Sequence, residues 1–313
     1  MSKPLRLVFM GTPDFAVPSL QALLDGPDEV VAVVCQPDRQ RGRGKILSPP
    51  PTKVLAEARH LPVLQPESVR KEPFLEQIRD LAPDLLVVVA YGKILPASLL
   101  QLPPLGAINV HGSLLPQYRG AAPIQWAVIN GETVTGITVM QLDEGMDTGP
   151  LLLRVPVAIG PQETAGALFD RLARLGGQTL AAALEQLKQG QLRSQPQDHA
   201  LASIAPMLTK EQGHLDWSLP ATDLHCLIRG LDPWPSAFSF LDGKRYRFFS
   251  PEIVRRQSPE PPGTICRADS QGLLIATGAD CLLIHEVQPE GKKRMEVAAC
   301  LRGAPLAPGT LLT

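Results

Sequence analysis

The chain has 313 residues, 44% of them hydrophobic, so it is long enough for two domains with cores of their own. Its 30 Lys and Arg residues balance 31 Asp and Glu residues, so any nucleic-acid-binding surface must be local rather than spread over the protein. The five scattered cysteines form no Cys-x-x-Cys pair, and no apolar run is long enough for a signal peptide or a membrane span. We therefore expect a cytoplasmic protein with no structural zinc and no membrane partner.

The first part of the chain alternates apolar runs with helical patterns. Strands are predicted at 5–10, 30–35, 61–64 and 85–90, and helices at 15–24, 52–59 and 74–81. The Val-rich run at 85–90 is typical of a central parallel strand. This order predicts a doubly wound α/β domain with a mostly parallel, Rossmann-like sheet. The first turn contains one glycine, Gly11, so the dinucleotide fingerprint is absent and a nicotinamide cofactor is disfavoured.

A basic segment, RQRGRGK at 39–45, interrupts this pattern. Charge runs of this kind are usually solvated surface loops. The glycines and arginines suit a mobile anion-binding loop equally well, because guanidinium groups donate paired hydrogen bonds to phosphate oxygens. From the residues alone, the two interpretations are equally supported.

A polar motif lies on the next predicted strand, at 107–111. Because side chains alternate along a strand, Asn109 and His111 share one face, whereas Ile108 and Val110 share the other. The strand leads into a turn-rich loop of the kind that carries function at the carboxyl end of a strand in an open α/β sheet. Taken alone, the pattern favours a simpler interpretation, in which the Asn and His side chains only hydrogen-bond the turn.

Further segments could complete a site around this motif. The strand at 85–90 is followed by Tyr91, which would lie beside the motif if consecutive parallel strands are neighbours. A helix is predicted at 121–129 and a strand at 136–142, followed by the acidic loop DEGMDTG at 143–149. That loop is either a plain turn or the source of a carboxylate partner for His111. A strand at 151–157 and a long amphipathic helix at 164–187 close the domain.

The remainder of the chain predicts a second domain. A polar, proline-containing segment predicts a linker, and we divide the chain into a catalytic domain at 1–189, a linker at 190–207 and a second domain at 208–313. The second domain has a helix at 223–229 and short strands at 237–241, 245–249, 263–267, 273–277 and 281–287. This pattern is typical of a small β-barrel of the oligonucleotide-binding (OB) type. Its basic clusters suit solvation when taken singly, and together with residues 39–45 they could frame a groove for a polyanion.

Several of these segments recur together in one known family. The first set is NVHGSLLP at 109–116, RGAAP at 119–123 and DTG at 147–149. These residues resemble the folate-dependent formyltransferases. VFMGTPDFA at 8–16, QPDR at 36–39 with GRGK at 42–45, and DPWP at 232–235 look like the members that formylate methionyl initiator tRNA. The similarity spans essentially the whole chain, including the carboxyl-terminal barrel.

The resemblance implies a one-carbon transferase that moves a formyl group from 10-formyltetrahydrofolate to the α-amino group of methionyl initiator tRNA, for translation initiation. It implies that Asn109, His111 and Asp147 form the catalytic set. The residues expected at the folate are Ser113, Leu114, Leu115, Pro116, Ala90, Tyr91, Gly92 and Ile94. The loop around Arg43 would clamp the acceptor end of the tRNA, and the barrel would hold the tRNA body. The candidate tRNA contacts are Arg39, Arg41, Arg43, Lys45, Lys292, Lys293 and Arg294.

The chemistry of formyl transfer is consistent with these residues. The reaction passes through a tetrahedral oxyanion, which needs a hydrogen-bond donor where charge develops. Asn109 and a protonated or polarised His111 would supply it, and Asp147 would orient the imidazole. No metal is required, and we expect a monomer. A formyltetrahydrofolate hydrolase, a transferase acting on a nucleotide sugar, and an RNA-binding module with an inert catalytic domain remain as alternatives.

Overall fold

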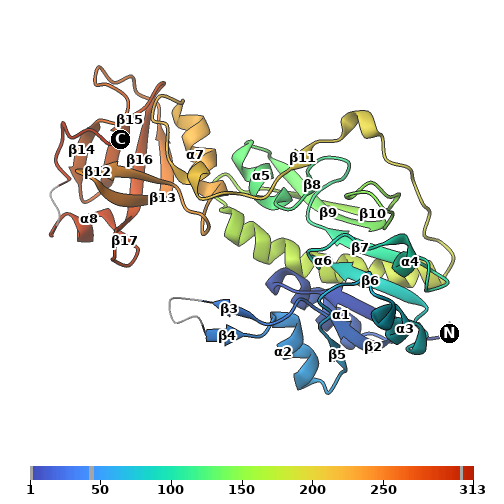
Figure 1. The fold of residues 1–313 in the computed structure, drawn as a ribbon. Coiled ribbons are helices and arrows are strands. Elements are labelled where there is room, and N and C mark those ends of the chain that lie inside the picture. The colour runs from blue at the N-terminus through green and yellow to red at the C-terminus, as the bar shows by residue number, and fades with distance from the viewer. Residues whose placement is uncertain (1–2, 42–45, 304–305) are drawn as a thin grey trace. The chain divides into compact units, whose positions relative to one another are not determined.

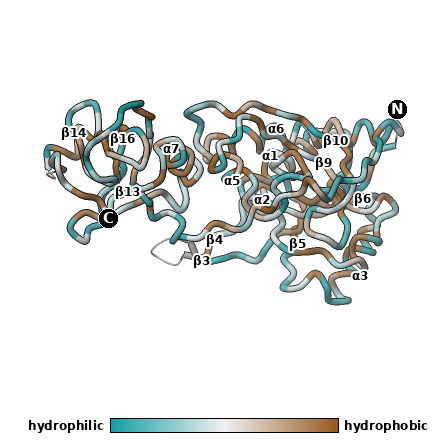
Figure 2. Tube along the Cα trace, turned by 90° about the horizontal axis from the view of Figure 1, so that it is seen from above, coloured by the Kyte–Doolittle hydropathy of each residue, from teal (hydrophilic) through white to brown (hydrophobic). Residues whose placement is uncertain are grey.

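The computed structural model describes residues 3–41, 46–303 and 306–313. The chain divides into two compact units that interleave in sequence. The amino-terminal unit comprises Met1–Pro123, Val134–Ala158 and Phe169–Ala205, and the carboxyl-terminal unit comprises Ile124–Thr133, Ile159–Leu168 and Pro206–Thr313. Each unit contains hydrophobic segments of its own, drawn brown in Figure 2. This division follows packing, and the limits expected for the functional domains stay a prediction.

The amino-terminal unit is built on a 7-stranded sheet (Figure 1). Its strands are β1 Arg6–Gly11, β2 Glu29–Val34, β5 Val63–Leu64, β6 Leu85–Val89, β7 Ala107–His111, β9 Val134–Gln141 and β10 Leu151–Ala158. They lie in the order β10-β9-β7-β6-β1-β2-β5. The strands from β7 to β5 pair in parallel, whereas β9 runs antiparallel to both β7 and β10. The predicted doubly wound, mostly parallel sheet is confirmed.

Helices cover both faces of this sheet. They are η1 Asp14–Ala16, α1 Val17–Leu24, α2 Pro51–Ala58, α3 Glu72–Asp80, α4 Ala97–Leu100 and α6 Ala165–Lys188. On one face, Ile78 of α3 and Leu99 of α4 join the core formed by alternate residues of β1, β2 and β6. On the other face, α6 packs so closely that a Cβ at Gly176 would lie 3.2 Å from Val110 Cγ1. Because side chains alternate along β7, Asn109 and His111 point away from α6.

Two short paired strands lie at the two ends of the basic segment, where we expected a loop, and we call this pair of strands the basic hairpin. β3 Arg39–Arg41 pairs antiparallel with β4 Ile46–Ser48. At its base, Lys53 Nζ donates to both carboxylate oxygens of Asp38 at 3.0 Å and to Gln65 Oε1 at 2.9 Å. Hydrogen bonds from Gln65 and then from Lys53 lower the pKa of Asp38. These contacts tie the base of the hairpin to α2 and to the segment after β5.

Residues 195–205, within the segment predicted as a linker, run along the amino-terminal unit, and we call them the strap. Leu151 and Gln195 exchange two backbone hydrogen bonds, of 2.7 and 2.9 Å. Further along, β11 Ile204–Ala205 pairs in parallel with β8 Arg119–Gly120. The strap also contains η2 His199–Leu201. Its backbone is therefore held at both ends by the unit that carries β7.

The carboxyl-terminal unit contains an antiparallel sheet in the order β12-β13-β16-β15-β14, with β17 paired to β16. Its strands are β12 Phe238–Leu241, β13 Lys244–Val254, β14 Ile265–Asp269, β15 Gly272–Ala276, β16 Cys281–Pro289 and β17 Met295–Glu296. Its helices are α5 Pro123–Ile129, η3 Glu211–Gly213, α7 Ala221–Gly230 and α8 Val297–Cys300. The smaller antiparallel domain of barrel type was predicted correctly. β13 continues beyond the predicted end because Pro251 still pairs, with Ile284 of β16.

His225 on α7 is a buried titratable group of this unit. The residue is 7% exposed, and its Nε2 lies 3.2 Å from Gln162 Oε1. Arg229, one turn further along α7, donates to the carbonyl of Glu163 at 3.0 Å. Burial, and to a smaller extent the charge of Arg229, lowers the pKa of His225 from 6.5 to about 4. The folded unit therefore keeps this imidazole neutral.

This shift predicts that the carboxyl-terminal unit loses stability in weak acid. Between pH 6.5 and pH 4 the unfolded chain binds a proton that the folded chain excludes, so the free energy of unfolding falls as the pH falls. At pH 5 the loss relative to pH 7 is about 2 kcal/mol. All 3 tryptophans belong to this unit, so their fluorescence reports its urea unfolding. His225→Gln should lose about 2 kcal/mol less than wild type between the two pH values, and an equal loss in both proteins would contradict the prediction.

Candidate active site

Asn109 and His111 lie on one face of β7, toward its carboxyl end. Asn109 is 8% exposed and His111 is 6% exposed. Within the described part of the chain, the Asn109 side-chain amide makes no hydrogen bond. The amide therefore has its two donor hydrogens and its acceptor oxygen available to a bound molecule.

The His111 ring lies between two acceptors. Its Nε2 is 2.9 Å from the carbonyl oxygen of Tyr118, and its Nδ1 is 3.6 Å from Asp147 Oδ2. Since a carbonyl can only accept, Nε2 carries a proton. The carboxylate of Asp147 faces Nδ1 from just beyond hydrogen-bond length. The structure thus brings together the histidine and the carboxylate that the sequence proposed as partners.

Asp147 reaches this position through an unusual course of its loop. Gln141, at the end of β9, pairs with Ile108 near the start of β7, whereas Asp147 lies beside His111 at the other end. The loop must therefore run back along the face of β7 that bears the polar side chains. The backbone of Asp147 is in the left-handed region, with φ 55°. Its Oδ2 accepts a hydrogen bond of 2.8 Å from the Gly120 amide.

Gly149 makes the return of this loop possible. A Cβ at this position would lie 1.9 Å from the carbonyl oxygen of Gln141. No other residue fits such a close backbone approach without displacing one of the two segments. The glycine of the DTG motif is therefore explained by packing between the loop and the end of β9.

The loop proposed for folate binding is held by a threonine of β9. Thr138 Oγ1 donates to the carbonyl of Ser113 at 2.6 Å and accepts from the amide of Leu115 at 3.1 Å. Ser113 Oγ donates to the carbonyl of Gln117 at 2.6 Å. Leu115 is fully buried in a cluster with neighbouring strand residues, whereas Leu114 and Pro116 are half-buried. Ser113 and Leu115 thus maintain the shape of the loop, and the other two have surface left for a ligand.

The residues proposed at the end of β6 also divide into buried and accessible ones. Ala90 and Gly92 have positive φ values, of 47° and 84°, and both are exposed. Ile94 is 58% exposed, which is unusual for a large apolar side chain in an ordered loop. Tyr91 is buried, its hydroxyl has no partner among the described residues, and burial raises its pKa to about 12. Tyr91 is therefore part of the core, and its neighbours form the accessible surface.

Only part of the basic hairpin can be described. Arg39 is exposed on β3. Arg43 and Lys45 lie outside the described residues, and so does the side chain of Arg41. The structure therefore does not test their proposed contacts with tRNA.

The three basic residues at 292–294 in the carboxyl-terminal unit differ in their contacts. Lys292 and Lys293 are exposed, and neither forms an ion pair in the described ranges. The Arg294 guanidinium instead pairs with Asp232 at 3.0 Å and with Glu286 at 2.6 Å. Hydrogen bonds from Arg294 contribute most to lowering the pKa of Glu286. Arg294 is thus engaged within its own unit, and the two lysines are the unpaired charges.

Sequence reasoning missed three residues that support this site: Thr138, Arg119 and Gln197. Thr138 is one of two threonines in its strand, and nothing in the pattern marks it. Arg119 belongs to the RGAAP motif, which could have drawn attention to it. Gln197 lies in a segment predicted as a linker, where no local signal exists.

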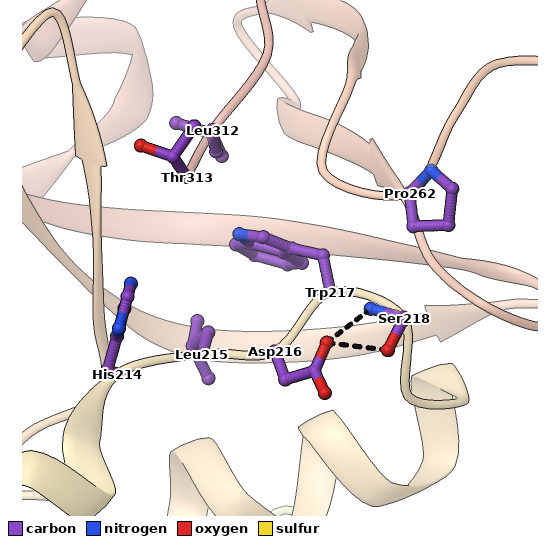
Figure 3. Close-up of a pocket in the computed structure, with 8 residues that line it drawn as sticks. All are labelled: His214, Leu215, Asp216, Trp217, Ser218, Pro262, Leu312 and Thr313. Atoms are coloured by element: carbon purple, nitrogen blue, oxygen red, sulfur yellow. Dashed lines mark hydrogen bonds between the residues drawn. The ribbon is translucent and has the colours of Figure 1, made fainter.

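A separate pocket of about 550 Å³ lies in the carboxyl-terminal unit (Figure 3). It is lined by His214, Leu215, Asp216, Trp217, Ser218, Pro262, Leu312 and Thr313. Asp216 accepts hydrogen bonds from the amide and the hydroxyl of Ser218, at 3.0 and 2.6 Å, and these bonds lower its pKa. The Asp216 carboxylate of the pocket is thus already hydrogen-bonded within the unit. None of the predicted site residues lines this pocket.

No group of His, Cys, Asp and Glu side chains within the described residues could hold a metal ion. No helix in the same ranges combines the length and the apolar character needed to cross a membrane.

Two family models match the chain. The model for formyl transferase matches residues 5–184, and the model for the formyl transferase C-terminal domain matches residues 207–305. The chain therefore belongs to the formyl transferase family, which confirms the resemblance found in its motifs.

The relatives narrow this family assignment. The chain is 60% identical to methionyl-tRNA formyltransferase from Desulfotalea psychrophila over 310 residues, which are 99% of this chain and 96% of the relative. It is 48% identical to methionyl-tRNA formyltransferase from Desulforamulus reducens over 309 residues, 98% of either chain. HypX from Aquifex aeolicus, solved in complex with tetrahydrofolic acid, shares the fold with a TM-score of 0.63 at 16% identity. That match covers 99% of this chain and 51% of HypX, so the chain spans about half the length of HypX.

Replacing Thr138 with Val should destabilise the loop at 113–116. The isosteric change leaves the Ser113 carbonyl and the Leu115 amide buried without a partner, which costs about 1–3 kcal/mol. Urea unfolding followed by circular dichroism measures the loss. Thr135→Val is the matched control, because Thr135 is also buried on β9 and its hydroxyl has no hydrogen bond within the described chain. Equal stability of the two variants would contradict the assigned role of Thr138.

Proposed function

We propose that the protein transfers the formyl group of 10-formyltetrahydrofolate to the α-amino group of methionyl initiator tRNA. The observation that carries this proposal is the Asn109 amide, which has no hydrogen-bond partner among the described residues and lies on the same strand as His111, beside Asp147. The near full-length identity to methionyl-tRNA formyltransferases supports the choice of acceptor. The tetrahydrofolic acid bound by HypX supports a folate-derived donor.

Asn109 and His111 would act on the charge that develops in the reaction. The neutral amine attacks the formyl carbon, and the formyl oxygen becomes an oxyanion. The Asn109 amide is free to donate to that oxygen, and such a donor is worth about 10² to 10³ in rate. The Nε2 proton of His111 is donated to the Tyr118 carbonyl, so in this geometry Nδ1 is the ring nitrogen left to face the reacting groups and Asp147.

Breakdown of the tetrahedral intermediate completes the transfer. The bond between the formyl carbon and N10 of the folate breaks, and its electron pair returns to N10. The amine loses one proton and N10 gains one, so the reaction needs no net acid or base. Asp147 would orient the His111 ring through both steps, because it is the carboxylate that faces Nδ1.

The donor and the acceptor would bind through different segments. We assign the folate to the accessible parts of residues 113–116 and 90–94, with Ile94 as an apolar contact. We assign the acceptor end of the tRNA to the hairpin that contains Arg43, and the tRNA body to Lys292 and Lys293. Arg294, which is engaged in ion pairs, would contribute mainly to the shape of that surface. We place the reaction in the cytoplasm, where charged initiator tRNA is used, and we propose a monomer.

Changes in the catalytic set should abolish most of the activity. Asn109→Ala, His111→Ala and Asp147→Asn should each lower kcat by about 10² to 10⁴ in formylation of charged initiator tRNA. Glu144→Gln is the matched control for Asp147→Asn, because Glu144 is an exposed carboxylate in the same loop. Near wild-type turnover in all three variants would rule out this mechanism. Parallel assays with uncharged tRNA and with buffer show whether water accepts the formyl group instead.

Arg43→Ala should affect the acceptor and not the donor. Loss of one charge-assisted contact with a phosphate should raise KM for tRNA about tenfold and leave KM for the folate unchanged. The salt dependence of tRNA binding should also weaken by about one unit of logarithmic slope. Arg70→Ala, which removes an exposed arginine outside the hairpin, is the control. A change confined to the KM of the folate would contradict the assignment.

A further inference from the structure

Gln197, in the strap, contacts the loop that contains Asp147 and also contacts Arg119, which precedes the Gly120 amide bound to Asp147. The residue is 6% exposed. Its Nε2 donates to the backbone carbonyls of Asp147 and Gly149, at 2.9 and 2.7 Å. Its Oε1 accepts from Nη2 and Nε of Arg119, at 2.6 and 3.2 Å. Both protons and both lone pairs of the amide are used, so the orientation of this side chain is determined by its partners.

Arg119 connects Gln197 to the other support of the catalytic carboxylate. Its guanidinium is buried, with 6% of the residue exposed, and it forms no ion pair within the described residues. Gln197 and His199 Nδ1, at 3.1 Å from Arg119 Nη2, are its acceptors. The next residue, Gly120, donates its amide proton to Asp147 Oδ2. Gln197 therefore braces the backbone of Asp147 directly and the donor to its carboxylate indirectly.

The position of Asp147 needs such bracing for two reasons. Its φ of 55° is in the left-handed region, which costs a residue with a Cβ about 1–2 kcal/mol. Contacts must offset that cost for the conformation to persist. The separation of 3.6 Å between Oδ2 and His111 Nδ1 exceeds the length of a hydrogen bond. A displacement of less than about 1 Å thus decides whether the carboxylate bonds the imidazole or leaves it.

We infer that Gln197 is a positioning residue for formyl transfer, which holds the loop of Asp147 in register with His111. This inference rests on the proposed function of Asp147, and it makes the strap part of the support of the active site. Gln197 acts on the reaction through Asp147 alone. Its loss should therefore change turnover rather than the binding of either substrate.

The kinetic test compares two changes at Gln197 with one at a neighbour. Gln197→Glu keeps an acceptor for Arg119 but places a carboxylate oxygen against two carbonyls, and Gln197→Met removes all four hydrogen bonds at similar length. Both should lower kcat about 10- to 100-fold, with KM for each substrate within about twofold of wild type. Gln195→Glu makes the same chemical change on an exposed side chain of the strap and should leave kcat unchanged. Wild-type kcat in both Gln197 variants would overturn the inference.

A double-mutant cycle separates positioning from a general effect on stability. If Gln197 acts through Asp147, Gln197→Met should cause no further loss of kcat in the Asp147→Asn background. Losses that multiply fully in the double variant would overturn the inference.

Hydrogen exchange of the loop provides a readout that does not depend on the acceptor. In Gln197→Met, amides in a peptide covering residues 143–150 should exchange faster than in Gln195→Glu, while peptides from the rest of the sheet exchange alike. Unchanged exchange in that peptide would overturn the positioning role. A wild-type protein that formylates no methionyl-tRNA would contradict the proposed function instead, so the two failures are distinguishable.

Discussion

Asp147 lies within 3.6 Å of the His111 imidazole only because its loop runs back along the face of β7. The antiparallel register of β9 starts that loop opposite Ile108, so the chain must cover the length of β7 to reach His111. Two glycines serve this return. Gly149 permits the close approach to β9, and the Gly120 amide holds the carboxylate.

The supports of the site come from segments that are far apart in the chain. Thr138 of β9 shapes the loop proposed for the folate, and Gln197 of the strap braces the loop of Asp147. Thr138 hydrogen-bonds backbone groups on both sides, and Gln197 divides its hydrogen bonds between two backbone carbonyls and the Arg119 guanidinium. By contrast, the Asn109 amide uses none of its capacity within the described residues. That difference separates the groups that build the site from the group that is available to the reactants.

The basic residues show how far a charge pattern can be interpreted without a structure. Lys292, Lys293 and Arg294 are equivalent in the sequence, but only the two lysines lack an ion pair in the described ranges. Arg294 satisfies two carboxylates of its own unit, because a folded barrel brings Asp232 and Glu286 to it. Similarly, the base of the basic hairpin is anchored by Asp38 and Lys53.

The sequence by itself determined the α/β order of the sheet strands, the smaller antiparallel domain and the common face of Asn109 and His111. These features follow from local periodicity, since apolar runs and alternation are properties of neighbouring residues. The motifs also determined the family, which the matching models confirm. Only the tertiary structure decided how the loop of Asp147 returns to His111, that Arg294 is engaged in ion pairs, and that a predicted linker contributes Gln197 to the site. Each of these depends on a contact between segments distant in sequence, where register, loop course and burial leave no local pattern.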